Sequence, residues 1–172
     1  MTGNKKIRNA TVCKSISGIT FKSTLEKSFY KTLVENGITP EYEPTQFTLY
    51  EGFKPITPFY DVESTNKRDK RDAEEGRTSK SSRRLELKNS KIVGIRYTPD
   101  FHFKYNDIDI YIEAKGIEND VFYIKKKLFR KYLDDKFLKE GTKSIYFEIY
   151  TKKQLLQALQ IIKEYGNKEG IK

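Results

Sequence analysis

The sequence predicts an α/β fold in which helices flank a mixed central β-sheet. Two observations favour this fold: helix-like and strand-like segments follow one another along the chain, and two neighbouring segments have the period-two pattern of a β-hairpin. The chain has 172 residues, which is enough to bury one substantial core. We therefore expect a single domain over residues 1–172.

The first predicted elements are a basic arm and a helix. Residues 1–22 contain several basic residues and no acidic residue, which indicates an arm of positive charge. The helix is expected to begin at Ser23 and to end before Gly37, because serine and glycine are favourable caps at these two ends. Its buried side is predicted from apolar residues at helical spacing: Leu25, Phe29, Leu33 and Val34.

The middle of the chain contains strand-like segments around a charged stretch. Residues 45–50 are predicted to form a strand, and strand character returns over residues 92–97. Residues 63–91 are expected to be a charged insertion or exposed loop, because most of this stretch is strongly polar and lacks a period.

The clearest local prediction is an antiparallel hairpin formed by residues 97–105 and 108–115. Asn106-Asp107 is a natural turn between them, so Tyr105 should face Ile108, and Asp100 should face Glu113. One face of the hairpin is then apolar and contains Phe101, Phe103, Tyr105, Ile108, Ile110, Ile112 and Ala114. The other face contains Asp100, His102, Tyr111, Glu113 and Lys115.

The C-terminal third of the chain is predicted to contain a helix, a strand and a second helix. The helix over 121–138 should turn four residues inward: Val121, Ile124, Leu128 and Phe129. The strand covers 144–150. The last helix covers 152–165 and carries an apolar stripe of Leu155, Leu156, Leu159 and Ile162.

Composition restricts the function classes. The chain has 34 basic and 24 acidic residues and a net charge of +10, which favours a polyanionic partner. The single cysteine, Cys13, excludes a disulfide framework and a cysteine-based zinc site, and it fits a reducing cytoplasm. No apolar run approaches the ~20 residues of a membrane-spanning helix, so we expect a cytoplasmic protein without membrane contact.

The polar hairpin face suggests a metal-dependent chemistry. Opposed residues of a hairpin have Cβ atoms roughly 5 Å apart, and like charges placed so closely destabilise a sheet. Asp100 and Glu113 therefore favour a bound cation, and hard oxygen ligands suit Mg²⁺ or Mn²⁺, with the Ala114 carbonyl as a further ligand. Lys115 would orient or deprotonate an attacking water, or stabilise developing charge. The alternative is that Glu113 and Lys115 belong to a solvated strand face.

Other polar residues have structural alternatives. Glu26 completes the capping-box pattern Ser23-x-x-Glu26, which explains it without catalysis. Glu41 and Glu43 flank Tyr42 at the entry to a strand, and alternation predicts that both face one way, in a structural or a functional role. His102 fits a hydrogen-bonding group as well as a catalytic one.

The order Leu25-Glu26, Pro99-Asp100 and Glu113-Ala114-Lys115 resembles the active-site pattern of the PD-(D/E)xK nucleases. The segments from Phe21 to Glu26, Glu41 to Glu43, Tyr97 to Phe101, and Glu113 to Gly116 more closely resemble bacteriophage endonuclease I, a Holliday junction resolvase. The resemblance covers roughly residues 20–50 and 95–118. It implies a restriction-endonuclease-like core and Mg²⁺-dependent cleavage of branched DNA by a domain-swapped homodimer, in keeping with a phage-encoded protein of a bacterial cell.

The resemblance also implies roles for individual residues. Catalytic roles fall on Glu26, Glu41, Asp100, Glu113 and Lys115, and metal-binding roles on Glu26, Asp100, Glu113 and Ala114. The positive charge predicts DNA contacts by residues of the arm and of the helix over 121–138: Lys5, Lys6, Arg8, Lys125, Lys126, Lys127 and Arg130.

The chain also departs from that family. It has the charged stretch over 63–91, a longer link between Asp100 and Glu113, and a C-terminal portion without a match. Two alternatives therefore stay open: a restriction, nicking or repair-type endonuclease without preference for branches, and a DNA-binding module without catalysis.

Overall fold

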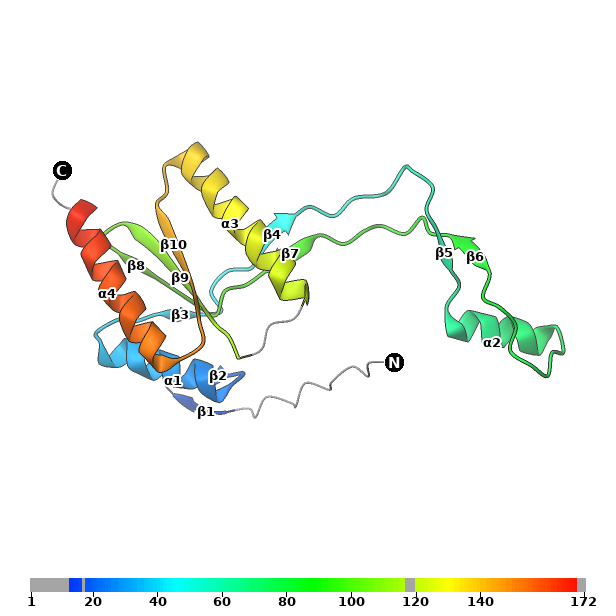
Figure 1. The fold of residues 1–172 in the computed structure, drawn as a ribbon, viewed down its shortest axis with the longest axis horizontal. Coiled ribbons are helices and arrows are strands. Elements are labelled where there is room, and N and C mark those ends of the chain that lie inside the picture. The colour runs from blue at the N-terminus through cyan, green and yellow to red at the C-terminus, as the bar shows by residue number, and fades with distance from the viewer. Residues whose placement is uncertain (1–12, 17, 117–119, 170–172) are drawn as a thin grey trace. The chain divides into compact units, whose positions relative to one another are not determined.

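A computed structural model gives the fold of the chain (Figure 1) and describes residues 13–16, 18–116 and 120–169. Within these residues the chain is a mixed α/β fold with four helices, a four-stranded mixed sheet and three two-stranded sheets. The helices are α1 (Thr24–Glu35), α2 (Thr65–Glu74), α3 (Asp120–Glu140) and α4 (Lys152–Glu169). The prediction of an α/β fold with a mixed sheet is confirmed.

The four-stranded sheet has the order β10-β9-β8-β3. Its strands are β3 (Glu41–Tyr42), β8 (Phe101–Tyr105), β9 (Ile108–Ala114) and β10 (Ser144–Ile149). The small sheets pair β1 (Cys13–Ile16) with β2 (Ile19–Phe21), β4 (Phe47–Tyr50) with β7 (Ile95–Tyr97), and β5 (Tyr60–Val62) with β6 (Leu85–Leu87).

The chain divides into two compact units, a division that the prediction of one domain did not anticipate. The first unit consists of the chain up to Leu49 and from Arg96 onward, and it contains the four-stranded sheet. The second unit is Tyr50–Ile95, with α2, β5 and β6.

The predicted hairpin and its register are confirmed, but its first strand is shorter than predicted, because β8 begins at Phe101 and Tyr97 belongs to β7. Strand β8 pairs antiparallel with β9, and Tyr105 is the partner of Ile108. Asn106 and Asp107 have φ angles of 47° and 60°, so both adopt the left-handed conformation that a two-residue hairpin turn requires and that Asn and Asp tolerate well. The register, continued by one pair beyond β8, brings Asp100 to the position opposite Glu113.

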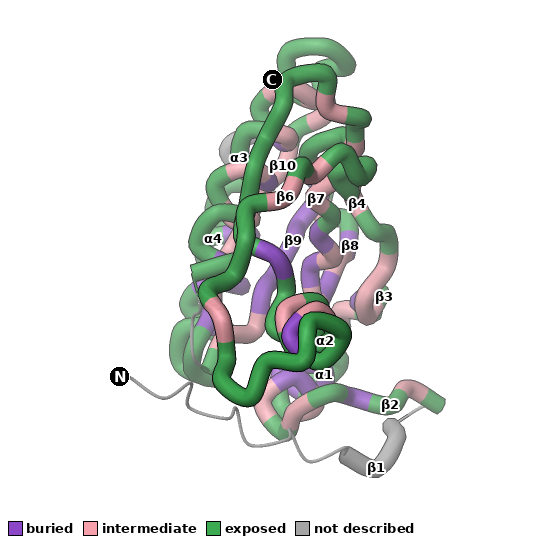
Figure 2. The backbone as a smooth tube through the Cα atoms, turned by 90° about the vertical axis from the view of Figure 1, so that its right-hand side faces the viewer, coloured by how far each residue is buried: buried purple, intermediate pink, exposed green. Residues whose placement is uncertain are grey.

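Helices cover both faces of this sheet. Helices α1 and α4 pack on the face that carries Phe101, Ile110 and Ile112, and these residues belong to the larger core cluster. Helix α3 packs on the other face through Phe129, beside Tyr111. Figure 2 shows buried residues along β9, whose strand residues up to Glu113 are all buried.

Each of the three predicted helix stripes contains an error. In α1, Phe29 and Leu33 are buried, but Val34 is 48% exposed. In α4, Leu156 is exposed on the side away from the buried residues of its stripe.

In α3 Phe129 is buried as predicted, but the rest of the buried side differs from the predicted one. Val121 and Ile124 are exposed, whereas Phe122, Phe129 and Leu133 are buried. A shift of one residue turns a helix face by about 100°. The aromatic rings of Phe122 and Phe129 fill the space against the sheet, so they decide which side of α3 faces inward.

The charged stretch over 63–91 was predicted to be a charged insertion or an exposed loop, and it contains a helix and a strand rather than loop alone. Ser64 caps α2, and Arg71 on that helix donates to Glu63 and Ser81. Asp72 accepts a hydrogen bond from the Ser81 backbone N–H over 2.9 Å. These polar contacts take the place of an apolar core in the segment. The segment therefore lacks the hydrophobic periodicity from which helices and strands are predicted in a sequence.

The N-terminal region contains more structure than the predicted arm. Strands β1 and β2 pair as a short antiparallel hairpin before α1. The candidate DNA contacts Lys5, Lys6 and Arg8 lie outside the described residues. Within the described part of the chain, none of the helices has the length and apolar character needed to cross a membrane.

Candidate active site

One hollow of about 360 Å³ in the first unit brings together most of the predicted catalytic residues. It lies beside the end of the hairpin formed by β8 and β9, where Asp100 and Lys115 flank the two strands. The lining includes both acids and bases: Lys22, Glu43, Arg96, Asp100, Glu113, Lys115 and Lys125.

Asp100 is fixed by the backbone that follows Glu113. Pro99 is buried, and the next residue, Asp100, precedes β8 directly. One carboxylate oxygen of Asp100, Oδ2, accepts a hydrogen bond of 2.7 Å from the Ala114 backbone N–H. The hairpin register therefore determines where this carboxylate lies.

Glu113 is buried on β9, and its carboxylate has two polar partners. The Lys115 Nζ lies 2.7 Å from Oε1, and the Tyr97 hydroxyl donates to Oε2 over 2.6 Å. Because that hydroxyl has only one proton to donate, it accepts from the Tyr146 hydroxyl, 3.0 Å away. The Lys115 ammonium also lies 3.6 Å from the centre of the Phe122 ring.

The surroundings of the site favour acidic groups that are either protonated or paired with a positive charge. Burial, followed by the nearby charge of Glu113, raises the pKa of Asp100 to about 8. Burial also raises the pKa of Tyr97 above its ordinary value, with Glu113 acting in the same direction, so the Tyr97 hydroxyl keeps its proton. Burial and the charge of Glu113 both raise the pKa of Asp100, and a cation placed beside its carboxylate would oppose both.

The donor set fits a hard divalent cation in its chemistry. Asp100 and Glu113 offer carboxylate oxygens, and the Ala114 carbonyl lies between Glu113 and Lys115 in the chain. Among the described residues, however, no group of three or more histidine, cysteine, aspartate or glutamate side chains is arranged as a metal site. Both carboxylate oxygens of Glu113 have partners in the structure, Lys115 on one and Tyr97 on the other.

Glu26 lies in the N-terminal cap of α1, as the capping-box alternative predicted. Its backbone N–H donates to the Ser23 hydroxyl over 3.1 Å, and that hydroxyl donates to Oε1 over 2.8 Å. Its Oε2 accepts from the Lys22 backbone N–H over 3.0 Å and from the Tyr42 hydroxyl over 2.5 Å. Both carboxylate oxygens of Glu26 therefore serve the helix start, and Glu26 is not among the described residues that line the hollow.

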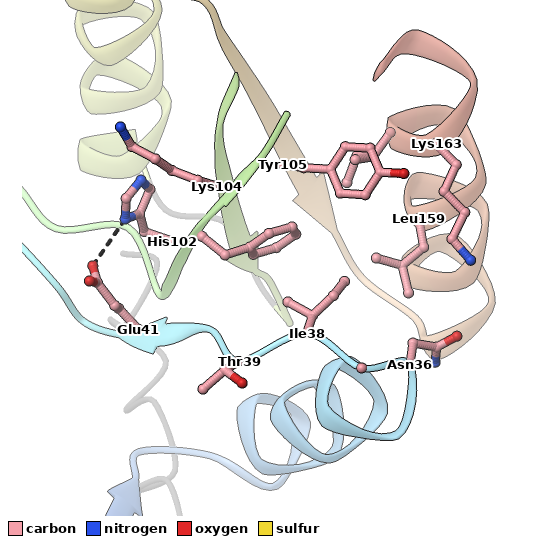
Figure 3. A pocket seen from close by; sticks show the side chains of 12 residues that line it. Asn36, Ile38, Thr39, Glu41, His102, Lys104, Tyr105, Leu159 and Lys163 are labelled. Atoms are coloured by element: carbon pink, nitrogen blue, oxygen red, sulfur yellow. Dashed lines mark hydrogen bonds and ion pairs between the residues drawn. The ribbon is translucent and has the colours of Figure 1, made fainter. Parts of the chain in front are cut away.

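Glu41 lies in another place, beside His102 (Figure 3). Its Oε2 is 3.0 Å from His102 Nδ1, and the Nε2 of the same ring is 3.0 Å from the buried Asp109. The ring of His102 also stacks on Tyr111. The structure thus holds His102 between two carboxylates and does not bring Glu41 to Asp100 and Glu113.

Glu43 lines the hollow, although alternation predicted that it would face the same way as Glu41. Strand β3 ends at Tyr42, and Glu43 has a φ of 45°, which breaks the alternation. Its backbone N–H donates to the Asp100 carbonyl over 2.8 Å, and its carboxylate pairs with Lys22. Unlike Asn or Asp in a turn, a glutamate gives no sequence signal for a positive φ, so the place of Glu43 at the hollow, and of Lys22 paired with it, was missed.

The predicted DNA contacts on α3 have different surroundings. Lys125 lines the hollow, and Arg130 is exposed. Lys126 pairs with Glu148 over 2.9 Å, and the Lys127 ammonium lies 4.2 Å from the centre of the Tyr123 ring.

Comparisons with known proteins identify no family for the chain. No family model, curated protein or solved structure matches the chain.

Proposed function

We propose that the chain is a Mg²⁺-dependent DNA endonuclease with a restriction-endonuclease-like core and Asp100, Glu113 and Lys115 at its active site. The observation that supports this most directly is their common place beside one hollow, with Lys115 in contact with Glu113. Acidic and basic groups alternate around the same hollow, as a site for a phosphodiester and a cation requires.

The chain's own residues have distinct roles in this proposal. Asp100, Glu113 and the Ala114 carbonyl would hold Mg²⁺, or Mn²⁺ in its place, and the metal supplies Lewis acidity toward a phosphate oxygen and a bound water. Tyr97 orients Glu113 through its hydrogen bond. Lys115 positions the attacking water or stabilises charge that develops on the phosphate.

The preferred DNA and the assembly follow from the sequence resemblance. We propose that branched DNA, including four-way junctions, is the substrate, and that a homodimer with exchanged segments supplies two active sites. The net charge of +10 supports a polyanionic partner. Action in the bacterial cytoplasm is part of the same proposal.

The test compares purified variants on a supercoiled plasmid in Mg²⁺. Asp100→Ala and Glu113→Ala should each be close to inactive, and Lys115→Ala should lose about 10²–10⁴-fold in rate. Glu35→Gln on exposed surface serves as the control and should cut at the normal rate.

Full activity of Asp100→Ala would show that the site is assigned wrongly. A wild-type protein that binds DNA but never cuts it, in Mg²⁺ or Mn²⁺, would instead favour a DNA-binding module.

A further inference from the structure

Lys22 and Glu43 form an ion pair at the edge of the hollow. Lys22 lies between β2 and α1, and its Nζ contacts Glu43 Oε1. The Lys22 backbone is held by its hydrogen bond to Glu26, so the start of its side chain has a fixed position. The side chains are 68% and 31% exposed, which makes this pair open to exchange with ions from solvent.

The backbone ties Glu43 to the acid that is central to the proposed site. The Glu43 N–H donates to the carbonyl of Asp100 itself, and both side chains line the same hollow. Glu43 is therefore an acidic neighbour of Asp100 in space, although the two residues are far apart in the sequence.

The Lys22 ammonium lies in a field of several carboxylates. Glu43 raises the pKa of Lys22 most, and the charges of Glu26 and Asp100 raise it further. A single positive charge thus faces three acids. The charge compensation that a divalent cation would provide at Asp100 is, in the structure, partly provided by a lysine.

We propose that Lys22 is a built-in competitor of the divalent cation: its ammonium group leaves Glu43 when the site is loaded, and Glu43 then serves as an acidic metal ligand beside Asp100 and Glu113. This inference rests on the proposed function and adds a residue to its metal site. It gives a reason why no group of three acidic ligands is found among the described residues, since lysines hold two of the acids concerned.

The test measures Mn²⁺ binding to the full-length protein without DNA by isothermal titration calorimetry. Loss of an outer-shell partner of a metal ligand typically lowers metal affinity by about 10–100-fold, so we expect Glu43→Gln, which removes a ligand, to lower it by at least about 10-fold. Lys22→Met removes the competitor, so it should bind Mn²⁺ several-fold more tightly than wild type. In the double variant Lys22→Met/Glu43→Gln the gain should disappear, because nothing is left for Lys22 to compete for.

Lys125→Met is the matched control for charge. Lys125 lines the same hollow, so this variant removes one positive charge from the site without touching the Lys22–Glu43 pair. It should tighten Mn²⁺ binding clearly less than Lys22→Met does. Circular dichroism in EDTA checks that every variant is folded, and Glu43→Asp, which keeps the charge but shortens the side chain, provides a second variant that should also bind more weakly.

The outcomes separate this inference from the proposed function. Mn²⁺ binding that Asp100→Ala abolishes but Glu43→Gln and Glu43→Asp leave unchanged would overturn the role of Glu43 and keep the metal site. Equal effects of Lys22→Met and Lys125→Met would overturn the competition. A wild-type protein that binds no Mn²⁺ would overturn both proposals.

Discussion

Asp100 is a carboxyl group that the fold holds where ionisation is unfavourable. Its side chain is partly buried, it accepts a backbone hydrogen bond, and it lies beside another acid. The pKa of about 8 means that the native state binds the proton more tightly than the unfolded chain, in which an aspartate has a pKa near 3.9. This residue therefore links the stability of the protein to pH.

The first prediction concerns stability in EDTA. A raised carboxyl pKa contributes stability that is full below about pH 4 and is lost as the pH rises toward about 8. Over pH 5–9 the melting temperature of wild type should therefore fall more steeply than that of Asp100→Asn, which has no proton to lose. Parallel curves from differential scanning fluorimetry would contradict the raised pKa.

The second prediction concerns the Tyr97 hydroxyl, which donates to a buried carboxylate. Tyr97→Phe leaves that carboxylate oxygen without its donor, at a cost of about 1–3 kcal/mol in unfolding free energy. Urea unfolding in EDTA measures the loss. Tyr146→Phe is the control, because its hydroxyl contacts Tyr97 rather than Glu113, and it should cost less. A larger loss in Tyr146→Phe would mean that Glu113 is not held in the way described.

The third prediction concerns Glu26 and compares stability with turnover. Both oxygens of Glu26 accept hydrogen bonds at the start of α1, and an amide has one acceptor oxygen only. Glu26→Gln should therefore lower the unfolding free energy by about 1–2 kcal/mol and leave cleavage near normal at a temperature where the protein is folded. Lost cleavage with unchanged stability would favour a metal ligand instead.

Among the secondary-structure elements, the register of the hairpin was predictable from the sequence, whereas each predicted helix face contained an error. Alternation over β8 and β9 and the Asn106-Asp107 turn specify the register with local signals, so Asp100 and Glu113 could be brought together from sequence. The inward side of α3 depends on how aromatic rings fit against the sheet. This packing depends on residues far away in the chain, so the local periodicity of the helix does not predict it.

The candidate active site has the same limit: contacts between residues far apart in the chain leave no local pattern in the sequence. Asp100, Glu113 and Lys115 belong to regular strand spacing and were found, whereas Glu43 depends on one left-handed residue after a two-residue strand. The placement of Glu26 was ambiguous in the sequence because the capping pattern and the nuclease pattern use the same glutamate.

The fourth prediction concerns a close approach of two backbone segments in the second unit. A Cβ atom on Gly52 would lie 2.7 Å from the Ile92 carbonyl oxygen, which also accepts the Phe53 N–H. Gly52→Ala should force these segments apart at a cost of about 1–3 kcal/mol. Hydrogen exchange should then be faster at the Phe53 and Ile92 amides, whereas Gly116→Ala, with open space around its Cβ position, should leave it unchanged. Equal protection in both variants would show that Gly52→Ala is accommodated without separating the two segments.

For the whole molecule, charge would determine how the proposed nuclease meets DNA. Basic residues exceed acidic ones, 34 to 24, and several of the acids are already paired with lysine or arginine within the fold. Phosphate contacts position a protein without reading sequence, so recognition by such a surface depends on the shape of the DNA. Each phosphate contact should add about 0.9 to the slope of log affinity against log salt concentration on duplex DNA.

The last prediction is preference for branched DNA, and it follows from two proposed active sites in one homodimer. Two active sites can cut a symmetric pair of strands in a four-way junction. A linear duplex has no crossover and therefore offers no such pair of strands. A synthetic junction should therefore be cut by paired incisions well ahead of a linear duplex of the same sequences, and both rates should fall steeply with salt. Denaturing gels with each strand labelled in turn measure the incisions, and sedimentation velocity measures the dimer. Equal cutting of both substrates across the salt range would contradict the preference for branched DNA and favour a general endonuclease. Paired incisions by a protein that sediments as a monomer would show that the dimer is not needed for cleavage.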